Sequence, residues 1–156
     1  MSRYNDYLRW MYRGARPNLW ARLQNRVSAV AFGAGIWPSR AAALQLRGRR
    51  SGREISVPVV ITELEGQRYL VAMLGERANW VRNVRAAEGR AVLRHRKKEL
   101  VRLEDVPVDQ RPAIIRQYLA VAPGARPHIP VDRNAPLSDF LPVAPGIPVF
   151  LINTDP

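Results

Sequence analysis

A basic turn between two short apolar segments is the part of the sequence best suited to chemistry. Gly48 and Gly52 bracket Arg49, Arg50 and Ser51. Glycine permits backbone conformations that expose consecutive N–H groups, and the arginines add positive charge around them. The turn is therefore a candidate cradle for an anion. The alternative is an ordinary solvated turn, because charged turns are common on protein surfaces.

A second stretch, residues 71–84, places an aromatic ring and an amide together. A strand of small and apolar residues stops at Gly75, and a helix is predicted to begin near Asn79. Trp80 and Asn83 are three residues apart and so share one helix face. An indole beside an amide that both donates and accepts suits the edge of a planar heterocycle. The alternative is a core tryptophan beside a helix-face asparagine.

Familiar catalytic motifs are missing. The serine of Gly48–Gly52 stands one place too late for the G-x-S-x-G nucleophile elbow. Pro38 replaces the third glycine of a dinucleotide-binding fingerprint, and no G-K-[ST] exists for a P-loop. The chain has no cysteine and two histidines, His95 and His128, far apart in sequence, so we expect no metal site.

The elements that must position these residues fit one globular domain of 156 residues. Short strands are predicted at 41–47, 54–64, 67–74, 90–95, 100–105 and 148–153, with helices at 79–87 and 107–121, the latter capped by Asp109. Because short turns join most strands, we predict an α+β fold, mainly β with flanking helices. About six mostly antiparallel strands would close into a small barrel with the helices packed outside.

Positive charge is concentrated near the N-terminus. The formal net charge is +12, and residues 1–53 hold eleven arginines and one acid, a net of +10. This excess indicates an anionic partner, such as nucleic acid, a membrane surface or an acidic ligand.

We predict an N-terminal amphipathic helical segment over residues 1–38, with helical spacing at 4–12 and 18–32, followed by a cofactor-binding domain over 39–156. The helix either packs on the sheet or rests on anionic lipid through Trp10, Trp20 and Trp37. The uncharged run over residues 27–39, the longest in the N-terminal segment, is too short and broken to span a bilayer. We expect a cytoplasmic protein, with contact at the inner membrane face left open.

The order of the motifs resembles a known family. The sequence has G-R-R-S-G, then Val57-Pro58-Val59, then Leu74-Gly75, then Trp80-x-x-Asn83 and a helix ended by glycine. Over roughly residues 40–153 this pattern resembles the deazaflavin-dependent nitroreductase family, split β-barrel oxidoreductases of actinobacteria and relatives that use coenzyme F420. The resemblance implies hydride transfer from reduced F420 to a quinone or nitroaromatic acceptor.

The resemblance also implies which residues hold the cofactor. Arg49, Arg50 and Ser51 match the turn that holds the phosphate and glutamate tail. The strand that borders the cofactor matches Ile55, Ser56, Val57, Pro58, Val59 and Val60. The strand end beside the deazaflavin matches Ala72, Met73, Leu74 and Gly75, and the helix that closes the pocket matches Asn79, Trp80 and Asn83.

One position departs from the family pattern. Ala125 stands where some relatives carry a tyrosine on the acceptor side of the pocket, and His128 is a candidate replacement as hydrogen-bond donor or proton source. Two other functions stay open: a non-catalytic carrier of a cofactor or fatty acid with the same fold, and a basic nucleic-acid-binding module. FMN is the alternative cofactor, because it also offers a planar tricycle and a phosphorylated tail.

Overall fold

The computed structural model describes residues 40–95 and 97–155. The predicted N-terminal segment, residues 1–38, lies outside this part of the chain, together with its two helices and its candidate lipid contacts. In the described part of the chain, no helix is both long enough and apolar enough to cross a membrane.

Seven strands in the described part of the chain form one sheet in which every neighbouring pair is antiparallel. In chain order they are β1 (Ala41–Arg47), β2 (Glu54–Val60), β3 (Thr62–Leu64), β4 (Gln67–Val71), β5 (Arg90–His95), β6 (Lys97–Asp105) and β7 (Val149–Thr154). Their order across the sheet is β2-β1-β5-β6-β7-β4-β3. The predicted mainly antiparallel α+β fold is confirmed.

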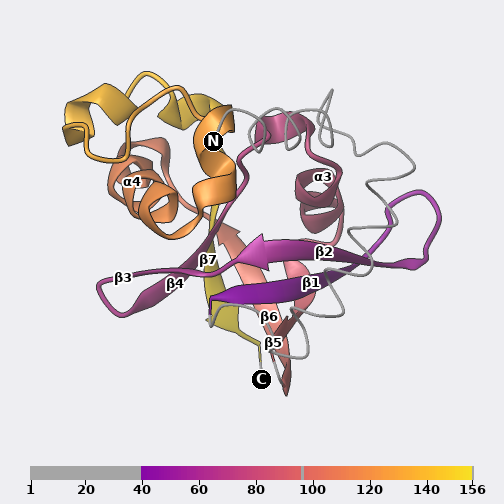
Figure 1. The fold of residues 1–156 in the computed structure, drawn as a ribbon. Helices are drawn as coiled ribbons and strands as arrows, with labels where there is room; N and C mark the ends of the chain where they lie inside the picture. The colour runs from indigo at the N-terminus through magenta and orange to yellow at the C-terminus, as the bar shows by residue number, and fades with distance from the viewer. Residues whose placement is uncertain (1–39, 96, 156) are drawn as a thin grey trace.

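The sheet closes because its two edge strands are consecutive in the chain. β2 and β3 lie at opposite ends of the strand order, yet Ile61 alone separates them. The Ile61 N–H donates to the Arg40 carbonyl oxygen at 2.7 Å, which holds the bend against the start of β1. A sheet whose opposite edges are joined by one residue must curl until those edges meet. The result is a split barrel (Figure 1).

Two helices cover two separate parts of the core. Helix α3 (Asn79–Ala86) packs Val81 and Val84 into the barrel cluster with Leu44, Leu93 and Phe150. Helix α4 (Arg111–Val121) has its own cluster, which includes Ile114, Ile115, Tyr118, Leu119, Phe140 and Val149. Figure 1 shows the two helices on either side of β7. The core thus has an α3 side and an α4 side.

Several predicted boundaries are wrong, each for a local reason. The segment 54–64 is two strands rather than one, because the chain bends at Ile61. β4 ends at Val71 instead of residue 74, since the chain then turns to reach Gly75 at φ 81°. The helix predicted from residue 107 begins as the 3₁₀ turn η3 (Val108–Gln110), and α4 starts at Arg111. Its N-cap is Gln110 rather than Asp109.

The final connection, between α4 and β7, contains short 3₁₀ turns. These are η4 (Pro123–His128), η5 (Leu137–Phe140) and η6 (Ala144–Gly146). They cover the α4 side, where Ala125, Phe140 and Ala144 are buried. A further 3₁₀ turn, η2 (Gly75–Arg77), joins the end of the β4 segment to α3.

Candidate functional site

The basic turn between β1 and β2 has a defined shape. The Gly48 N–H donates to the Arg53 carbonyl oxygen at 2.8 Å, and the Gly52 N–H donates to the Gly48 carbonyl oxygen at 2.9 Å. Gly52 has φ 71°, a left-handed conformation that glycine adopts without strain. The Ser51 hydroxyl oxygen accepts a hydrogen bond from the Arg53 N–H at 3.2 Å. The two glycines therefore support the turn as the sequence predicted.

Arg49 joins this turn to helix α3. Its backbone N–H donates to the side-chain oxygen of Asn83 at 3.1 Å, and its Nη1 donates to the same oxygen at 2.9 Å. Asn83 is 3% exposed. An asparagine buried on the inner face of a helix needs polar partners, and Arg49 supplies two donors to it. The two motifs singled out in the sequence are thus in direct contact.

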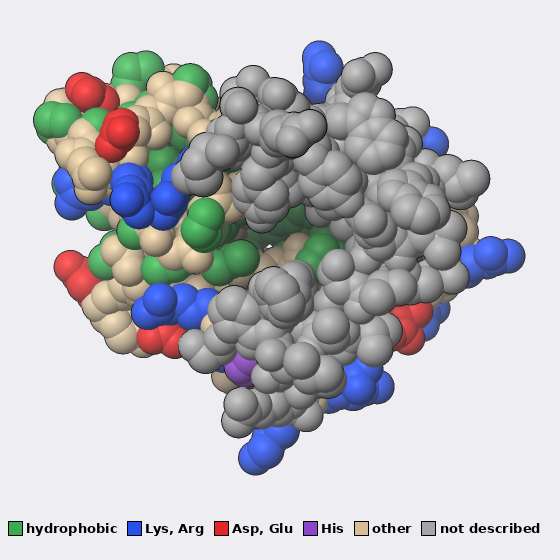
Figure 2. All heavy atoms as spheres, in the orientation of Figure 1, with side chains coloured by type: hydrophobic (Ala, Val, Ile, Leu, Met, Phe, Trp, Pro, Cys, Tyr) green, Lys and Arg blue, Asp and Glu red, His purple; other side chains and the backbone are tan. Residues whose placement is uncertain are grey.

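The tip of the turn presents donors to solvent. Arg50, Ser51 and Arg53 are exposed. Among the described residues, the backbone N–H groups of Arg50 and Ser51 have no hydrogen-bond partner. Figure 2 shows basic side chains projecting at the right-hand edge of the molecule, where Figure 1 places the β1–β2 loop. Consecutive free N–H groups beside guanidinium groups form the kind of concavity that binds anions.

Trp80 lies on the core side of α3. Its ring centroid is 5.7 Å from that of Phe150 in β7, and the two planes are tilted by 56°. The indole is partly buried against the barrel cluster. Trp80 and Asn83 therefore share one face of the helix, as their spacing predicted, and that face is turned toward the sheet. Asn79, at the start of α3, is half-buried.

The segment between β4 and α3 is tightly packed at Gly75. A methyl group on Gly75 would lie 3.0 Å from the Gly146 carbonyl oxygen, and Gly75 has φ 81°. Ala72 is buried, whereas Met73, Leu74 and Gly75 are half-buried. The close approach to η6 and the left-handed backbone both favour glycine at this position.

An ion-pair network holds η2 against α3. Arg85 of α3 donates to Glu76 of η2 and to Asp105 of β6, with Nη2 3.0 Å from the Asp105 Oδ1. The hydrogen bond from Arg85 lowers the pKa of Glu76, and the same bond raises the pKa of Arg85. The Arg85 guanidinium also lies 5.9 Å from the centroid of the Phe150 ring. These contacts tie α3 to η2 through Glu76 and to β6 through Asp105.

The residues named by the resemblance come from neighbouring parts of the fold. Ile55 to Val60 occupy β2, the edge strand next to β1, and Pro58 pairs with Ala43. A proline in this edge strand removes only a donor that faces away from the ladder. β2 is also in contact with β4 across the opening of the barrel. Of these residues, Val59, Leu74 and Trp80 pack against the α3-side cluster, whereas Val60 and Met73 pack against the α4-side cluster.

His128 belongs to a different part of the fold. It lies in η4, directly after α4, and its ring nitrogen Nε2 is buried. Its neighbour Ala125 is 1% exposed and packs in the α4-side cluster. The proposed proton-donor role of His128 stays a prediction.

Sequence reasoning missed Arg111, a buried arginine at the start of α4. It is 7% exposed, and its Nε donates to the Val106 carbonyl oxygen at 2.8 Å. Its Nη1 reaches the carbonyl oxygens of Ala144 at 3.0 Å and Ile147 at 3.3 Å. Arg111 thereby holds η6, which packs against Gly75. No pattern in the sequence marks it, because arginine is usually exposed and its carbonyl partners lie up to 36 residues away.

Among residues 40–95 and 97–155, no three His, Cys, Asp or Glu side chains are grouped so that they could hold a metal ion.

Comparison with known proteins gives one family match. A family model described as F420H(2)-dependent quinone reductase matches residues 20–138 of the 156. No curated protein matches the chain significantly.

Several solved structures share the fold. A protein of unknown function from Agrobacterium tumefaciens matches with a TM-score of 0.57 at 17% identity, over 84% of this chain and 55% of that one. An F420-H2 dependent reductase, FDR-A, matches with a TM-score of 0.51 at 17% identity, over 73% of this chain and 94% of that one. A heme binding protein from Mycobacterium smegmatis matches with a TM-score of 0.52 at 13% identity, over 82% of this chain and 51% of that one.

These similarities to solved structures indicate a shared fold and nothing further. The chain spans about half the length of the first and third of these proteins. The family match covers well over half of the chain. With the split barrel described above, it establishes that this chain belongs to the F420H(2)-dependent quinone reductase family.

Proposed function

We propose that the protein is a reductase that binds F420 on the α3 side and transfers a hydride to a quinone or nitroaromatic acceptor. The observation that carries this proposal is the pair of hydrogen bonds between Arg49 and Asn83. They hold the basic turn, whose Arg50 and Ser51 N–H groups have no partner among the described residues, beside the helix that carries Trp80. The contact fixes the candidate anion-binding turn and the helix that carries Trp80 relative to each other, as a cofactor with an acidic tail and a planar ring would require.

The anionic tail would bind at the turn. Arg50 and Arg53 would pair with phosphate or carboxylate oxygens, and the N–H groups of Arg50 and Ser51 would donate to the same oxygens. Asn83 would act through Arg49, because its side-chain oxygen already accepts two bonds from that residue. The residues present therefore fit the tail of this cofactor.

The ring would lie against the half-buried strand segments. Val57 to Val60 of β2 would border it on one side, and Met73, Leu74 and Gly75 would border it on another. Asn79 and Trp80 would close the site from α3. These half-buried apolar side chains would exclude water from the ring.

Positioning accounts for the absence of a familiar catalytic motif. The bound cofactor supplies the hydride, so the protein needs no covalent nucleophile. Its residues must hold donor and acceptor in contact and keep water out. His128, which lies in η4 on the α4 side, stays the sequence-based candidate for the source of the proton that an acceptor oxygen gains after the hydride arrives.

The proposal is tested by titrating the protein with F420 and, in parallel, with FMN at low and moderate salt. We expect F420 to bind more tightly, with an affinity that falls as salt rises, because exposed charges are screened. Arg50→Ala should weaken F420 binding by about tenfold, the loss of one hydrogen bond to a charged group. Arg133→Ala, another exposed arginine remote from the turn in sequence, is the matched control and should bind F420 normally.

Trp80→Ala should also weaken F420 binding, because it removes a contact with the cofactor's ring rather than with its anionic tail. If both Arg50→Ala and Trp80→Ala leave the F420 affinity unchanged, the assigned site is wrong. Retention on DNA without binding of either cofactor would favour the nucleic-acid-binding alternative.

A non-catalytic carrier is the second candidate. Ala125, at the family's tyrosine position, is buried in the α4-side cluster and offers no hydroxyl to an acceptor. One neighbour with this fold is described as a heme binding protein. Turnover of menadione or a nitroaromatic by the F420-loaded protein supports the reductase. Tight binding without turnover of any acceptor supports the carrier.

A further inference from the structure

The connection from β4 to α3 borders the proposed ring site but has little core of its own. None of the three residues of η2 is buried. The Gly75 N–H donates to the Ala72 carbonyl oxygen at 3.0 Å, and the Ala78 N–H donates to the Gly75 carbonyl oxygen at 3.2 Å. Hydrogen bonds of 3₁₀ turns have poor geometry, and segments with few buried contacts open locally at low cost. The position of η2 therefore depends on contacts made by other elements.

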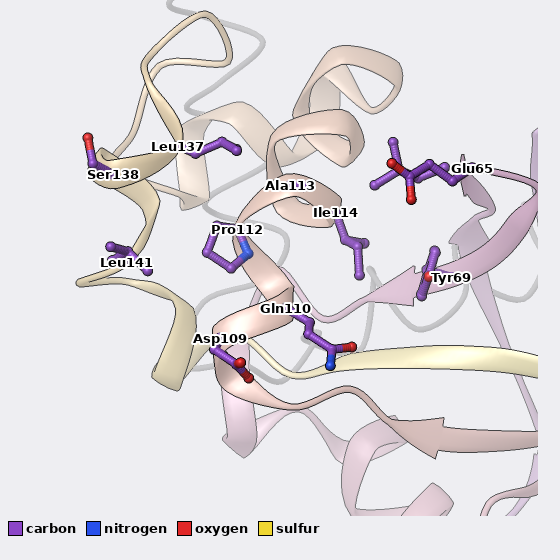
Figure 3. A pocket seen from close by; sticks show the side chains of 11 residues that line it. Glu65, Tyr69, Asp109, Gln110, Pro112, Ala113, Ile114, Leu137, Ser138 and Leu141 are labelled. Atoms are coloured by element: carbon purple, nitrogen blue, oxygen red, sulfur yellow. The ribbon is translucent and has the colours of Figure 1, made fainter.

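One of these contacts comes from the α4 side. Figure 3 shows Gln110 and Pro112 in the lining of a cavity of about 550 Å³ at the start of α4. Arg111, between them in the chain, does not line this cavity and donates instead to the Ala144 carbonyl oxygen of η6 at 3.0 Å. Because η6 packs closely against Gly75, Arg111 supports the β4 end of the connection from below.

The other contact comes from Arg85 of α3. Its Nη1 donates to one carboxylate oxygen of Glu76 in η2, and its Nη2 donates to the other at 3.1 Å. Nη2 also donates to Asp105 Oδ1 at 3.0 Å, and Asp105 is the cross-strand partner of Phe150 in the β6–β7 ladder. One side chain thus joins η2, α3 and the sheet.

The same guanidinium group lies beside the aromatic pair of the site. It is 5.9 Å from the centroid of the Phe150 ring, which in turn is 5.7 Å from the centroid of the Trp80 ring. A guanidinium group is planar and has five N–H donors, so it can stack on a ring and bind two carboxylates at the same time. A lysine ammonium group cannot reproduce this geometry.

The network has a local rather than a global effect. The side chains of Arg85 and Glu76 are 40% and 47% exposed, and exposed ion pairs contribute little to the stability of a whole domain. Opening of η2 alone, however, disrupts few other contacts, because no residue of η2 is buried. A contact of modest strength is therefore sufficient to decide how often η2 opens.

We propose that Arg85 is a positioning residue for hydride transfer, which keeps η2 and α3 at a fixed separation without contacting the cofactor. This role rests on the proposed function, in which residues 73–75 and Trp80 border the ring from two sides. A misplacement of about 1 Å can reduce a reaction rate by about 100-fold. Since the anionic tail binds at the β1–β2 turn, the affinity for F420 depends little on Arg85.

The first measurement needs no cofactor. Amide hydrogen exchange of the ¹⁵N-labelled full chain is followed at Gly75 and Ala78, whose N–H groups are hydrogen-bonded within the connection. Arg85→Met should accelerate exchange at both by about fivefold, the upper range for an exposed ion pair, and leave core amides such as that of Leu93 unchanged. Arg82→Met, which removes another exposed arginine of α3, is the matched control and should change neither rate.

The second measurement is single-turnover reduction of menadione by the protein loaded with reduced F420. One hydride passes to the quinone, the reduced cofactor also releases a proton, and the quinone takes up a proton, so the products are oxidised F420 and the quinol. Arg85→Met should lower this rate by about tenfold, whereas the dissociation constant of F420 should stay within about twofold of the wild-type value. Arg82→Met should react at the wild-type rate.

Further variants separate the bridge from its charge. Arg85→Lys keeps the charge but cannot bind Glu76 and Asp105 together, so it should recover less than about half of the rate lost in Arg85→Met. Glu76→Gln should also slow the reaction. The double variant Glu76→Gln/Arg85→Met should be no slower than Arg85→Met, because both changes remove the same contact.

Several outcomes overturn this role while the proposed function stands. They are unchanged exchange at Gly75 and Ala78 in Arg85→Met, an unchanged rate in that variant, and full recovery of the rate in Arg85→Lys. A loss of F420 affinity as large as the loss of rate would instead make Arg85 a direct ligand, and equal acceleration at core amides would make its role purely structural. A wild-type protein that binds no F420 overturns the proposed function and this role with it.

Discussion

The side-chain oxygen of Asn83 accepts two hydrogen bonds from Arg49, one from its backbone N–H at 3.1 Å and one from Nη1 at 2.9 Å. The two residues are 34 positions apart in the chain. The contact couples the shape of the β1–β2 turn to the position of α3. Any ligand that bridges turn and helix meets a surface that is already assembled, which reduces the entropy lost on binding.

Removing this contact should destabilise the fold and weaken cofactor binding together. Asn83→Leu eliminates the acceptor of both bonds and should lower the free energy of unfolding by about 2 kcal/mol. Asn83→Asp keeps an acceptor of the same shape beside Arg49 and should stay within about 1 kcal/mol of the wild type. Urea unfolding and F420 titration of both variants measure the two effects. An Asn83→Leu protein with wild-type stability would show that the contact does not hold the turn.

Two glycines with similar backbone angles should respond differently to alanine. Gly89 has φ 84°, and a methyl group there would lie 2.3 Å from the Leu103 carbonyl oxygen. Gly52 has φ 71°, with nothing within 4 Å of the added methyl group. Gly52→Ala should therefore cost only the left-handed strain, about 1 kcal/mol, whereas Gly89→Ala should cost about 3 kcal/mol or more. The comparison is made by urea unfolding, and equal costs would contradict the predicted clash.

Arg111 should contribute to stability through its hydrogen bonds to main-chain carbonyl groups. Arg111→Met fills the space but leaves the carbonyl oxygens of Val106, Ala144 and Ile147 without this donor. We expect a loss of about 3 kcal/mol in the free energy of unfolding. Arg116→Met, further along the same helix and half-exposed, is the control and should cost below about 0.5 kcal/mol. Equal losses in the two variants would refute the role of Arg111.

The ion pair between Arg68 and Glu99 should make stability depend on pH in the acid range. The hydrogen bond from Arg68 lowers the pKa of Glu99 in the folded protein. Between the unfolded pKa of about 4.3 and this lower value, the unfolded chain binds more protons, so stability falls as pH decreases.

Glu99→Gln should therefore lose less stability than the wild type between about pH 5 and pH 3. Both side chains are about one-third exposed, at 32% and 31%. Solvent screening limits the difference to less than about 1 kcal/mol, and added salt should reduce it. Chemical unfolding at several pH values is the measurement. A steeper acid loss in Glu99→Gln than in the wild type would have the wrong sign.

Short-range patterns predicted the regular elements well. The strands at 41–47 and 90–95 agree with the structure residue for residue, because apolar runs bounded by turn residues are local signals. Helix α3 ends one residue before its predicted end. The prediction of one strand over residues 54–64 was wrong at Ile61. The bend there depends on a hydrogen bond from the Ile61 N–H to the Arg40 carbonyl oxygen, and no local sequence pattern connects these two residues.

The amino-acid sequence by itself determined the strands, the basic turn, the shared face of Trp80 and Asn83 and, through motif order, the family. These features depend on residue type and on spacing of a few positions. Tertiary structure alone decided that Asn83 holds Arg49 and that Arg111 is buried among carbonyl oxygens. Each of these contacts joins residues that are distant in sequence, and barrel closure brings them together only after long loops have been closed at an entropic cost that no local pattern records.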